Sequence, residues 1–385
     1  MLIDSQKFVF ENIMSKSNET NNVFIINGNP GTGKSVVAIN LLASLLNQKQ
    51  NTVFVAPNTS FRNTLEENLK KQLKDSKEKL AWDVLFKGSG SFYGAIKNSF
   101  DWIIVDEGHR LKDKAYMYKG KNQIEDILLA GKNVVFFVDE YQAIRPNDIG
   151  NNKNIVEIAN SLNKKIYQGE EYFLQTQFRC SGADGYINAL DTVLQIQETA
   201  NVELTNNGDY EFRICETPQE MENLIKNKIR DGYKNSRIVA GFAWKWNSKE
   251  LKLDELRTNH DVVIEEYNYS IPWNYNDPKM LRATKEFDFL QAGCVHTVQG
   301  LEFDYCGVIV GNDLKNDEFN NIYADINEYK DNEGKKGLKN KPHELAKLVK
   351  NIYKVLMTRG QKGTFVFIRN KELREYFKQF VEKTK

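Results

Sequence analysis

A glycine-rich segment, GNPGTGKS, constrains the fold of this chain more than any other feature. It covers positions 28–35 and fits the pattern G-x-x-x-x-G-K-[ST] of a phosphate-binding loop. An apolar run, VFIIN, precedes it, and a helix-forming run, SVVAINLLASLL, follows it. Strand, loop and helix in this order predict a P-loop, because backbone N–H groups and the positive end of the helix dipole then face one phosphate. A glycine-rich turn that matches by chance is the alternative.

Short apolar runs alternate with amphipathic stretches along the rest of the chain. In the first half, almost continuously apolar runs lie at 23–27, 52–56, 102–106 and 134–139. In the second half, candidate strands lie at 171–178, 210–215, 237–244, 305–311 and 364–368. This alternation predicts an α/β fold with two domains, each a mainly parallel sheet flanked by helices. We place the domains at 1–168 and 169–385, and we expect an irregular surface excursion, the most mobile part, between Asp313 and Pro342.

Length, charge and cysteine content exclude several classes of protein. A chain of 385 residues suffices for two domains of ordinary size. The formal net charge is +1, so any contact with nucleic acid must be local rather than a general electrostatic attraction. No apolar run approaches the roughly 18 to 20 residues that span a bilayer, and the scattered cysteines predict reduced thiols rather than a zinc site. We therefore expect a soluble cytoplasmic protein with no membrane partner.

Two lysine clusters are candidates for a local contact with a polyanion. Their members are Lys70, Lys71, Lys74, Lys77 and Lys79 in one, and Lys335, Lys336, Lys339 and Lys341 in the other. Each cluster either lines a groove or belongs to ordinary solvated surface.

The P-loop predicts ATP and Mg²⁺ as cofactors. The residues expected to contact the phosphates are Gly28, Asn29, Pro30, Gly31, Thr32, Gly33, Lys34 and Ser35. Among them, Lys34 is expected to neutralise the β- and γ-phosphates, and Ser35 to coordinate Mg²⁺. Gln6 precedes the first strand by a short helix, where a glutamine either reads adenine or is an ordinary surface residue.

Two further strands end in polar residues that belong to the same chemistry. WIIVDEGH at 102–109 is an apolar strand followed by two carboxylates, of which Asp106 is expected to hold Mg²⁺ and Glu107 to polarise the attacking water. His109 either links the γ-phosphate to the next strand or is structural. VDEYQ at 138–142 ends at the same sheet edge, where Gln142 either senses the γ-phosphate or forms a turn.

Five segments, in this order, resemble the motif set of superfamily 1 helicases: GNPGTGKS, DEGHR, QFRCSGADGYINALD, VQGLEFDYCGVIVG and YKVLMTRGQKG. The chain is similar to the helicase-like domain-of-unknown-function family 2075, which is itself similar to the helicase portion of Schlafen proteins. The resemblance spans nearly the whole chain and implies two RecA-like P-loop domains that enclose ATP. The chain departs from the pattern in DEGH, where DEAQ or DEAD is commoner, and in DEYQ, which lacks the usual opening glycine.

The resemblance also assigns residues outside the P-loop. Arg179 and Arg359 would stabilise charge that develops on the γ-phosphate, with a surface salt bridge as the alternative. Gly300 and Glu302 would contact the nucleotide or couple its state to nucleic acid. The residues in loops that would hold a single strand are Thr59, Phe92, Tyr93, His296 and Thr297.

These assignments predict an ATP-hydrolysing motor that acts on single-stranded DNA or RNA. Translocation or remodelling is expected more than processive unwinding, because the short segment between Lys79 and Trp102 leaves no room for an accessory domain. The alternative is a nucleotide-gated switch that recruits a protein effector such as a nuclease. The family resemblance makes a role in bacterial anti-phage defence one further hypothesis.

Overall fold

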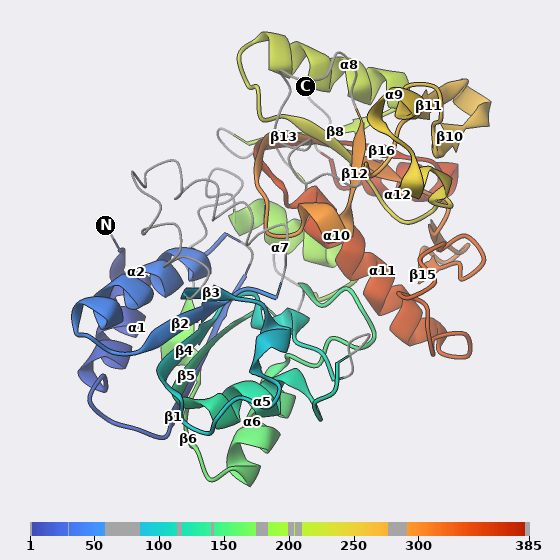
Figure 1. The fold of residues 1–385 in the computed structure, drawn as a ribbon. Coiled ribbons are helices and arrows are strands. Elements are labelled where there is room, and N and C mark those ends of the chain that lie inside the picture. The colour runs from blue at the N-terminus through green and yellow to red at the C-terminus, as the bar shows by residue number, and fades with distance from the viewer. Residues whose placement is uncertain are drawn as a thin grey trace. The chain divides into compact units, whose positions relative to one another are not determined.

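The chain divides into two compact units (Figure 1). The computed structural model describes residues 2–29, 31–57, 85–113, 118–139, 142–174, 184–198, 204, 210–275 and 291–381. The first unit contains Met1–Ala143 and Asn147–Phe178, and the second contains Ile144–Pro146 and Arg179–Lys385. The predicted boundary after residue 168 is therefore too early.

The first unit is built on a parallel sheet in the order β3-β2-β4-β5-β1-β6, and β7 also pairs with β1. The strands are β1 (Asn22–Gly28), β2 (Thr52–Val55), β3 (Phe86–Lys87), β4 (Phe100–Val105), β5 (Gly131–Val138), β6 (Lys165–Tyr167) and β7 (Phe173–Leu174). The strands β1, β4 and β5 are neighbours at the centre, so their carboxyl ends open at one edge.

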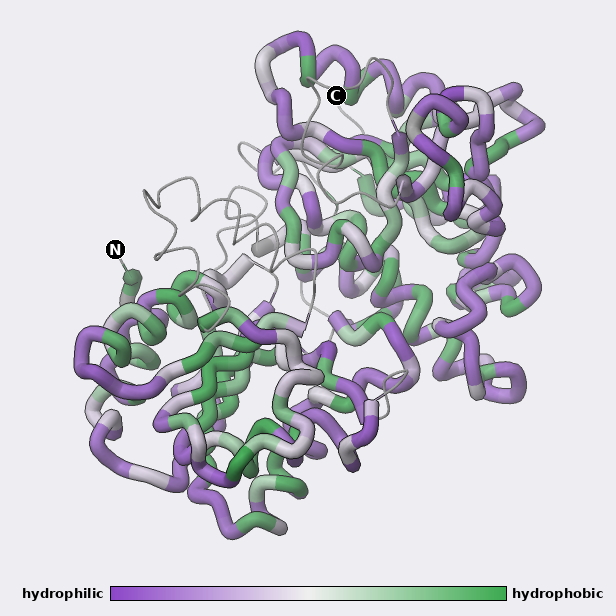
Figure 2. Tube along the Cα trace, viewed as in Figure 1, coloured by the Kyte–Doolittle hydropathy of each residue, from purple (hydrophilic) through white to green (hydrophobic). Residues whose placement is uncertain are grey.

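Helices cover both faces of this sheet because alternate strand residues point to opposite sides. One face packs against α1 (Asp4–Ser15) and α2 (Lys34–Asn47). The other face packs against α5 (Gln123–Ala130) and α6 (Asn152–Ser161). Figure 2 shows the strands of this unit as mainly hydrophobic and the connecting turns as mainly hydrophilic.

The second unit contains a parallel sheet in the order β12-β9-β13-β16-β8. Its strands are β8 (Glu211–Cys215), β9 (Arg237–Ala240), β12 (Ala292–Cys294), β13 (Phe303–Val310) and β16 (Gly360–Ile368). Its helices are α7 (Asp184–Val193), α8 (Pro218–Arg230), α9 (Leu253–Leu256), α10 (Val295–Val298), α11 (Pro342–Met357) and α12 (Lys371–Lys378). The prediction of two α/β domains with mainly parallel sheets is confirmed.

Two details of the predicted organisation are wrong. Only Phe173–Leu174 of the expected strand 171–178 is a described strand, and it pairs with Asn27–Gly28 of the first sheet instead of opening the second. The stretch from Asp313 to Pro342 is not an irregular excursion, because it contains the hairpin β14 (Leu314–Asn316) and β15 (Ile322–Ala324). The hairpin is fixed because Leu314 and Ile322 are buried in the core of the second unit.

Several smaller observations complete the fold. Cys215, Cys294 and Cys306 are buried thiols that form no disulfide within the described residues. Within the described ranges, no helix combines the length and apolar content needed to cross a membrane. The lysine cluster at 70–79 lies outside the described residues. A second antiparallel pair joins β10 (Val262–Ile264) to β11 (Tyr269–Ile271).

Candidate active site

The P-loop connects the end of β1 to the start of α2. Gly31 and Gly33 have φ angles of +84° and +81°, which favour glycine because a Cβ is strained there. A Cβ on Gly28 would lie 2.5 Å from Oγ1 of Thr32, so the loop closes too tightly for a larger residue. Gly33 is the N-cap of α2 and has no side chain to cap it, so the first N–H groups of the helix can receive an anion.

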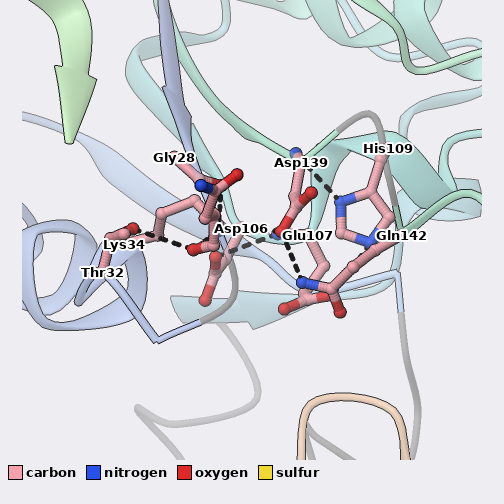
Figure 3. A network of polar contacts seen from close by, with 9 residues as sticks. Gly28, Thr32, Lys34, Asp106, Glu107, His109, Asp139 and Gln142 are labelled. Carbon is pink, nitrogen blue, oxygen red and sulfur yellow. Dashed lines mark hydrogen bonds and ion pairs between the residues drawn. The ribbon is translucent and has the colours of Figure 1, made fainter. Parts of the chain in front are cut away.

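Lys34 is almost fully buried, with an exposed fraction of 6%. Its Nζ donates to the carbonyl oxygen of Gly28 at 2.7 Å and to that of Asn29 at 2.9 Å. The same Nζ lies 3.4 Å from Oδ2 of Asp139, at the end of β5 (Figure 3). The ammonium group is therefore held at the place where a P-loop lysine meets phosphate.

Asp106 and Glu107 follow β4, the strand next to β5. The N–H of Glu107 donates to Oδ1 of Asp106 at 2.9 Å, and Asp106 is fully buried. Burial, and after it the neighbouring Glu107 carboxylate, raises the pKa of Asp106 to about 6. Burial disfavours ionised Glu107, but the contact with His109 and the positive charges of Lys34 and Arg110 outweigh burial and lower its pKa.

Glu107 also has an unusual backbone conformation. Its φ of +53° lies in the left-handed region that non-glycine residues rarely adopt. Such conformations carry strain and concentrate at functional sites. The turn aims the carboxylate toward His109, whose Nε2 lies 3.1 Å from Oε2 of Glu107.

His109 joins the two strand ends. Its Nδ1 accepts a hydrogen bond from the backbone N–H of Asp139 at 3.3 Å, so Nε2 carries the ring proton and faces Glu107. The histidine is 1% exposed. These contacts link the ends of β4 and β5.

Asp139 is the centre of this network, and sequence reasoning did not single it out. Its Oδ2 faces Lys34 and accepts a hydrogen bond from Nε2 of Gln142 at 2.6 Å. The signal was present in the sequence, because Asp139 ends the apolar run of β5 and carboxyl strand ends collect ligands. Figure 3 shows Lys34, Glu107, His109, Asp139 and Gln142 drawn together by these contacts.

Gln6 packs directly on the P-loop. Its Nε2 donates to the carbonyl oxygen of Thr32 at 3.0 Å, and its Oε1 accepts from the N–H of Ile3 at 3.3 Å. The side chain is 3% exposed, so Gln6 is not an ordinary surface glutamine. A glutamine fixed in this position can support the loop and present its remaining hydrogen-bonding capacity to a base.

The donor set fits Mg²⁺. Ser35 offers a hydroxyl and Asp106 a carboxylate, and oxygen ligands of this kind suit the ion. Within the described residues, Oδ2 of Asp106 is buried and has no hydrogen-bond partner. A buried carboxylate oxygen without a partner is costly, and a cation would satisfy it.

A pocket of about 790 Å³ opens beside the start of the P-loop. Asn29, Asp139, Gln168 and Phe173 are among the residues that line it. A ligand there would contact both the loop and the end of β5.

In the second unit, Arg359 is fully buried. Its Nε donates to the carbonyl oxygen of Val355 at 2.8 Å and its Nη1 to that of Leu301 at 3.2 Å. Gly300 has a φ of +86°, and Oε2 of Glu302 accepts from Nε2 of Gln361 at 2.6 Å. The two hydrogen bonds of Arg359 therefore connect the loop that contains Gly300 and Glu302 to the end of α11.

The candidate nucleic-acid residues have different surroundings. Phe92 is 1% exposed and packs against Phe100 in the core, so its prediction as a base-stacking residue is wrong for this structure. Tyr93 is 51% exposed. Nε2 of His296 lies 2.7 Å from Oδ2 of Asp331, and Oγ1 of Thr297 donates to the carbonyl oxygen of Cys294 at 2.9 Å. The predicted site residues outside the described ranges are Pro30, Thr59 and Arg179.

A family model described as "Schlafen group 3, DNA/RNA helicase domain" matches residues 21–370. An uncharacterized protein of Saccharomyces cerevisiae is 28% identical over 392 residues, which cover 92% of this chain and 83% of the yeast protein. The resemblance to the helicase portion of Schlafen proteins is confirmed by the family match.

Solved helicase structures are also similar to the chain. The Pif1 helicase from Candida albicans has a TM-score of 0.41 and 12% identity, with 98% of this chain and 99% of that chain covered. The arterivirus nonstructural protein 10 helicase has a TM-score of 0.41 and 10% identity, with 97% and 63% covered.

Proposed function

The chain belongs to the family of Schlafen group 3 DNA/RNA helicase domains, and on that premise we propose that it is an ATP-hydrolysing motor that acts on single-stranded DNA or RNA. Translocation along a strand, or remodelling of structures on it, is the proposed output. The observation that supports this most is the cluster of charged groups at the P-loop, where Lys34, Glu107 and Asp139 meet at adjacent strand ends.

Six residues at or near the P-loop have proposed roles in hydrolysis. Lys34 and the loop N–H groups bind the β- and γ-phosphates, and Gln142 senses the γ-phosphate. Glu107 polarises the attacking water, and His109 holds its carboxylate in place. Ser35 and Asp106 would hold Mg²⁺, which when bound supplies positive charge to the phosphates.

The second unit contributes positive charge in this proposal. Arg179 and Arg359 stabilise the charge that develops on the γ-phosphate, and Gly300 and Glu302 couple the nucleotide state to nucleic acid. Arg359 donates to two carbonyl oxygens, so it must exchange at least one of these bonds to reach a phosphate. Hydrolysis is then slow until a bound strand favours that exchange.

The proposed strand contacts are Tyr93, Thr297 and the loop around His296. The ring of Tyr93 is 51% exposed and makes an edge-on contact with Tyr118, with ring centroids 6.1 Å apart. A stacked base contributes about 1–3 kcal/mol without reading sequence. Binding of this kind tolerates any sequence.

The test is the rate of ATP hydrolysis by wild type and Lys34→Ala, measured with a panel of single- and double-stranded DNA and RNA. Wild type should hydrolyse slowly alone and several-fold faster with a single strand, and Lys34→Ala should be inactive throughout. If no oligonucleotide stimulates hydrolysis by the wild type, the motor is contradicted and a nucleotide-gated switch that recruits a protein effector takes its place.

A further inference from the structure

A short basic segment precedes α11 in the second unit. Residues 335–341, here called the basic turn, contain Lys335, Lys336, Lys339 and Lys341 and no acidic residue. Between positions 333 and 347 there are five lysines and two glutamates, whereas the whole chain has a net charge of +1. The basic turn is therefore a local concentration of positive charge on a nearly neutral protein.

Asp331 connects the basic turn to α10, the short helix that contains His296. Its Oδ2 faces Nε2 of His296 at 2.7 Å, and its Oδ1 accepts from the N–H groups of Glu333 at 3.1 Å and Gly334 at 3.0 Å. The carbonyl oxygen of Asp331 accepts from the N–H of Lys335 at 3.0 Å. Asp331 thus joins α10 through its carboxylate, and the first residue of the basic turn through its backbone carbonyl.

The basic turn itself has a fixed shape. Leu338 is 5% exposed and packs in the core of the second unit. Backbone bonds run from Leu338 to Lys335 and from Lys341 to Leu338, each at 3.0 Å. Because Leu338 points inward, Lys336 and Lys339 on either side of it are exposed.

The lysines of the basic turn differ in how far they are already neutralised. Nζ of Lys341 lies 2.9 Å from Glu344, and Nζ of Lys335 donates to the carbonyl oxygen of Tyr329 at 3.1 Å. Within the described part of the chain, no ion pair involves Lys336 or Lys339. These two ammonium groups are the ones available to an external anion.

The His296 ring contacts an aromatic side chain in addition to Asp331. The ring of Phe242 lies 5.2 Å from its ring, centroid to centroid, and Phe242 packs against Trp273 at 4.7 Å. The His296 side chain is 16% exposed. Its position is thus set by an aromatic wall and by Asp331, which suits a residue that positions a neighbouring segment.

We propose that the basic turn binds the phosphate backbone of the single strand, as an extension of the strand site at His296 and Thr297. This inference rests on the proposed function. Lys336 and Lys339 contact phosphates, and His296 acts through Asp331 as a positioning residue for the turn. Since the contacts are to phosphates, they strengthen binding to DNA and RNA of any sequence and weaken with salt.

The first experiment measures binding of labelled oligothymidylate and oligouridylate by fluorescence anisotropy over a series of salt concentrations. The variant is Lys336→Ala/Lys339→Ala, and the matched control is Lys252→Ala/Lys371→Ala, which removes two other exposed lysines of the second unit. The slope of log K against log salt should fall by about 1.4 in the variant, since each phosphate contact on a single strand contributes about 0.7. The control should keep the wild-type slope, and its basal ATP hydrolysis should be unchanged.

A wild-type slope in Lys336→Ala/Lys339→Ala would overturn the inference and leave the motor intact. If the wild type itself binds neither oligonucleotide, the proposed function fails first. The two failures are therefore distinguishable in one titration.

The second experiment identifies the residues that contact the strand. An oligonucleotide with photoreactive bases is cross-linked to wild type and to Asp331→Asn, and the attached peptides are identified by mass spectrometry. Wild type should give cross-links within residues 335–341, and Asp331→Asn should give fewer there with no loss at Tyr93. Cross-links that map only outside the basic turn would contradict the proposal. The proposal would also be contradicted if the basic turn binds an acidic protein while its mutation leaves oligonucleotide binding unchanged.

Discussion

In the first unit, Nζ of Lys34 lies 3.4 Å from Oδ2 of Asp139, and both side chains are almost fully buried. The P-loop lysine thus already has a carboxylate partner at the end of a neighbouring strand. A phosphate that binds the loop must replace this carboxylate as the partner of Lys34. The negative charge of the carboxylate also repels the phosphate. The same carboxylate accepts a hydrogen bond from Gln142. A change of partner at Lys34 therefore also affects the hydrogen bond of Gln142.

Asp139→Asn should therefore tighten nucleotide binding. The neutral amide removes a competitor for Lys34, and we expect the Kd for a fluorescent ADP analogue to fall about tenfold, which corresponds to about 1.4 kcal/mol. Equilibrium titration followed by anisotropy measures it. Asp101→Asn is the control, because Asp101 pairs with Lys132 at 2.7 Å away from the P-loop. Unchanged or weaker binding by Asp139→Asn would argue against competition for Lys34.

Glu107→Gln should separate binding from hydrolysis. The amide keeps the size of the side chain but cannot accept a proton from water, so kcat should fall by about 10²–10⁴. The Kd for ATP should stay within a few-fold of wild type. Single-turnover hydrolysis together with equilibrium binding gives both quantities, and a variant that retains wild-type kcat would remove Glu107 from its assigned role.

His109→Ala should lower both activity and stability. It leaves the buried N–H of Asp139 without its acceptor, which costs about 1–3 kcal/mol, and it frees the Glu107 carboxylate. We expect kcat to fall at least about tenfold, with KM little changed. Thermal unfolding and steady-state kinetics measure these effects. His343→Ala serves as the control because His343 is exposed, and an equal loss in both variants would contradict a specific role for His109.

A buried ion pair in the second unit predicts a large cost for a single substitution. Nζ of Lys354 lies 2.6 Å from Oδ1 and 2.8 Å from Oδ2 of Asp191, joining α11 to α7. Asp191→Ala should lower the unfolding free energy by about 3–5 kcal/mol, because a buried ammonium group then loses its counterion. Removal of the exposed pair Lys7–Glu11 should cost below about 1 kcal/mol. Denaturant titration measures the loss of unfolding free energy in both variants. An equal loss in the two would contradict the prediction.

Stability should also depend on the protonation of Asp313. Burial raises its pKa from the ordinary 3.8 to about 7, so the folded state holds this proton more tightly than the unfolded state. The contribution of Asp313 to stability is then complete below pH 3.8 and is lost as the pH rises to about 7. Asp313→Asn cannot ionise, so its stability relative to wild type should increase over this range.

Chemical denaturation of wild type and Asp313→Asn at several pH values tests the sign. Asp254→Asn, an exposed carboxylate in α9, is the control. A difference between wild type and Asp313→Asn that does not change with pH would show that the pKa of Asp313 is the same in the folded and unfolded states.

Most of the sheet architecture follows from the apolar runs. The runs at 23–27, 102–106 and 134–139 became β1, β4 and β5 because strands covered on both faces need continuous apolar sequence. The strand β12 was not predicted, since Ala292–Cys294 is too short to show a pattern. Which sheet a short strand joins is a tertiary property, and Phe173–Leu174 joined the first sheet through pairing that no local signal encodes.

The site shows the same division. Motif spacing identified Lys34, Asp106 and Glu107, because P-loop chemistry fixes those residue types at strand ends. The network around Asp139 was not predicted, since the neighbour relation of β5 to β1 and β4 depends on strand order. Burial of Phe92 could not be read from GSGSFYG either, because an aromatic residue in a loop can face the core or solvent.

The contact of Gly28 with Leu174 has a mechanical consequence. Gly28 pairs with Leu174, and a Cβ added to Gly28 would lie 3.2 Å from Cβ of Leu174. The neighbouring pair Asn27 and Phe173 belongs to the same short ladder. A displacement of the phosphate loop should therefore be passed through backbone pairing to Phe173 and Leu174, which are distant from the loop in sequence.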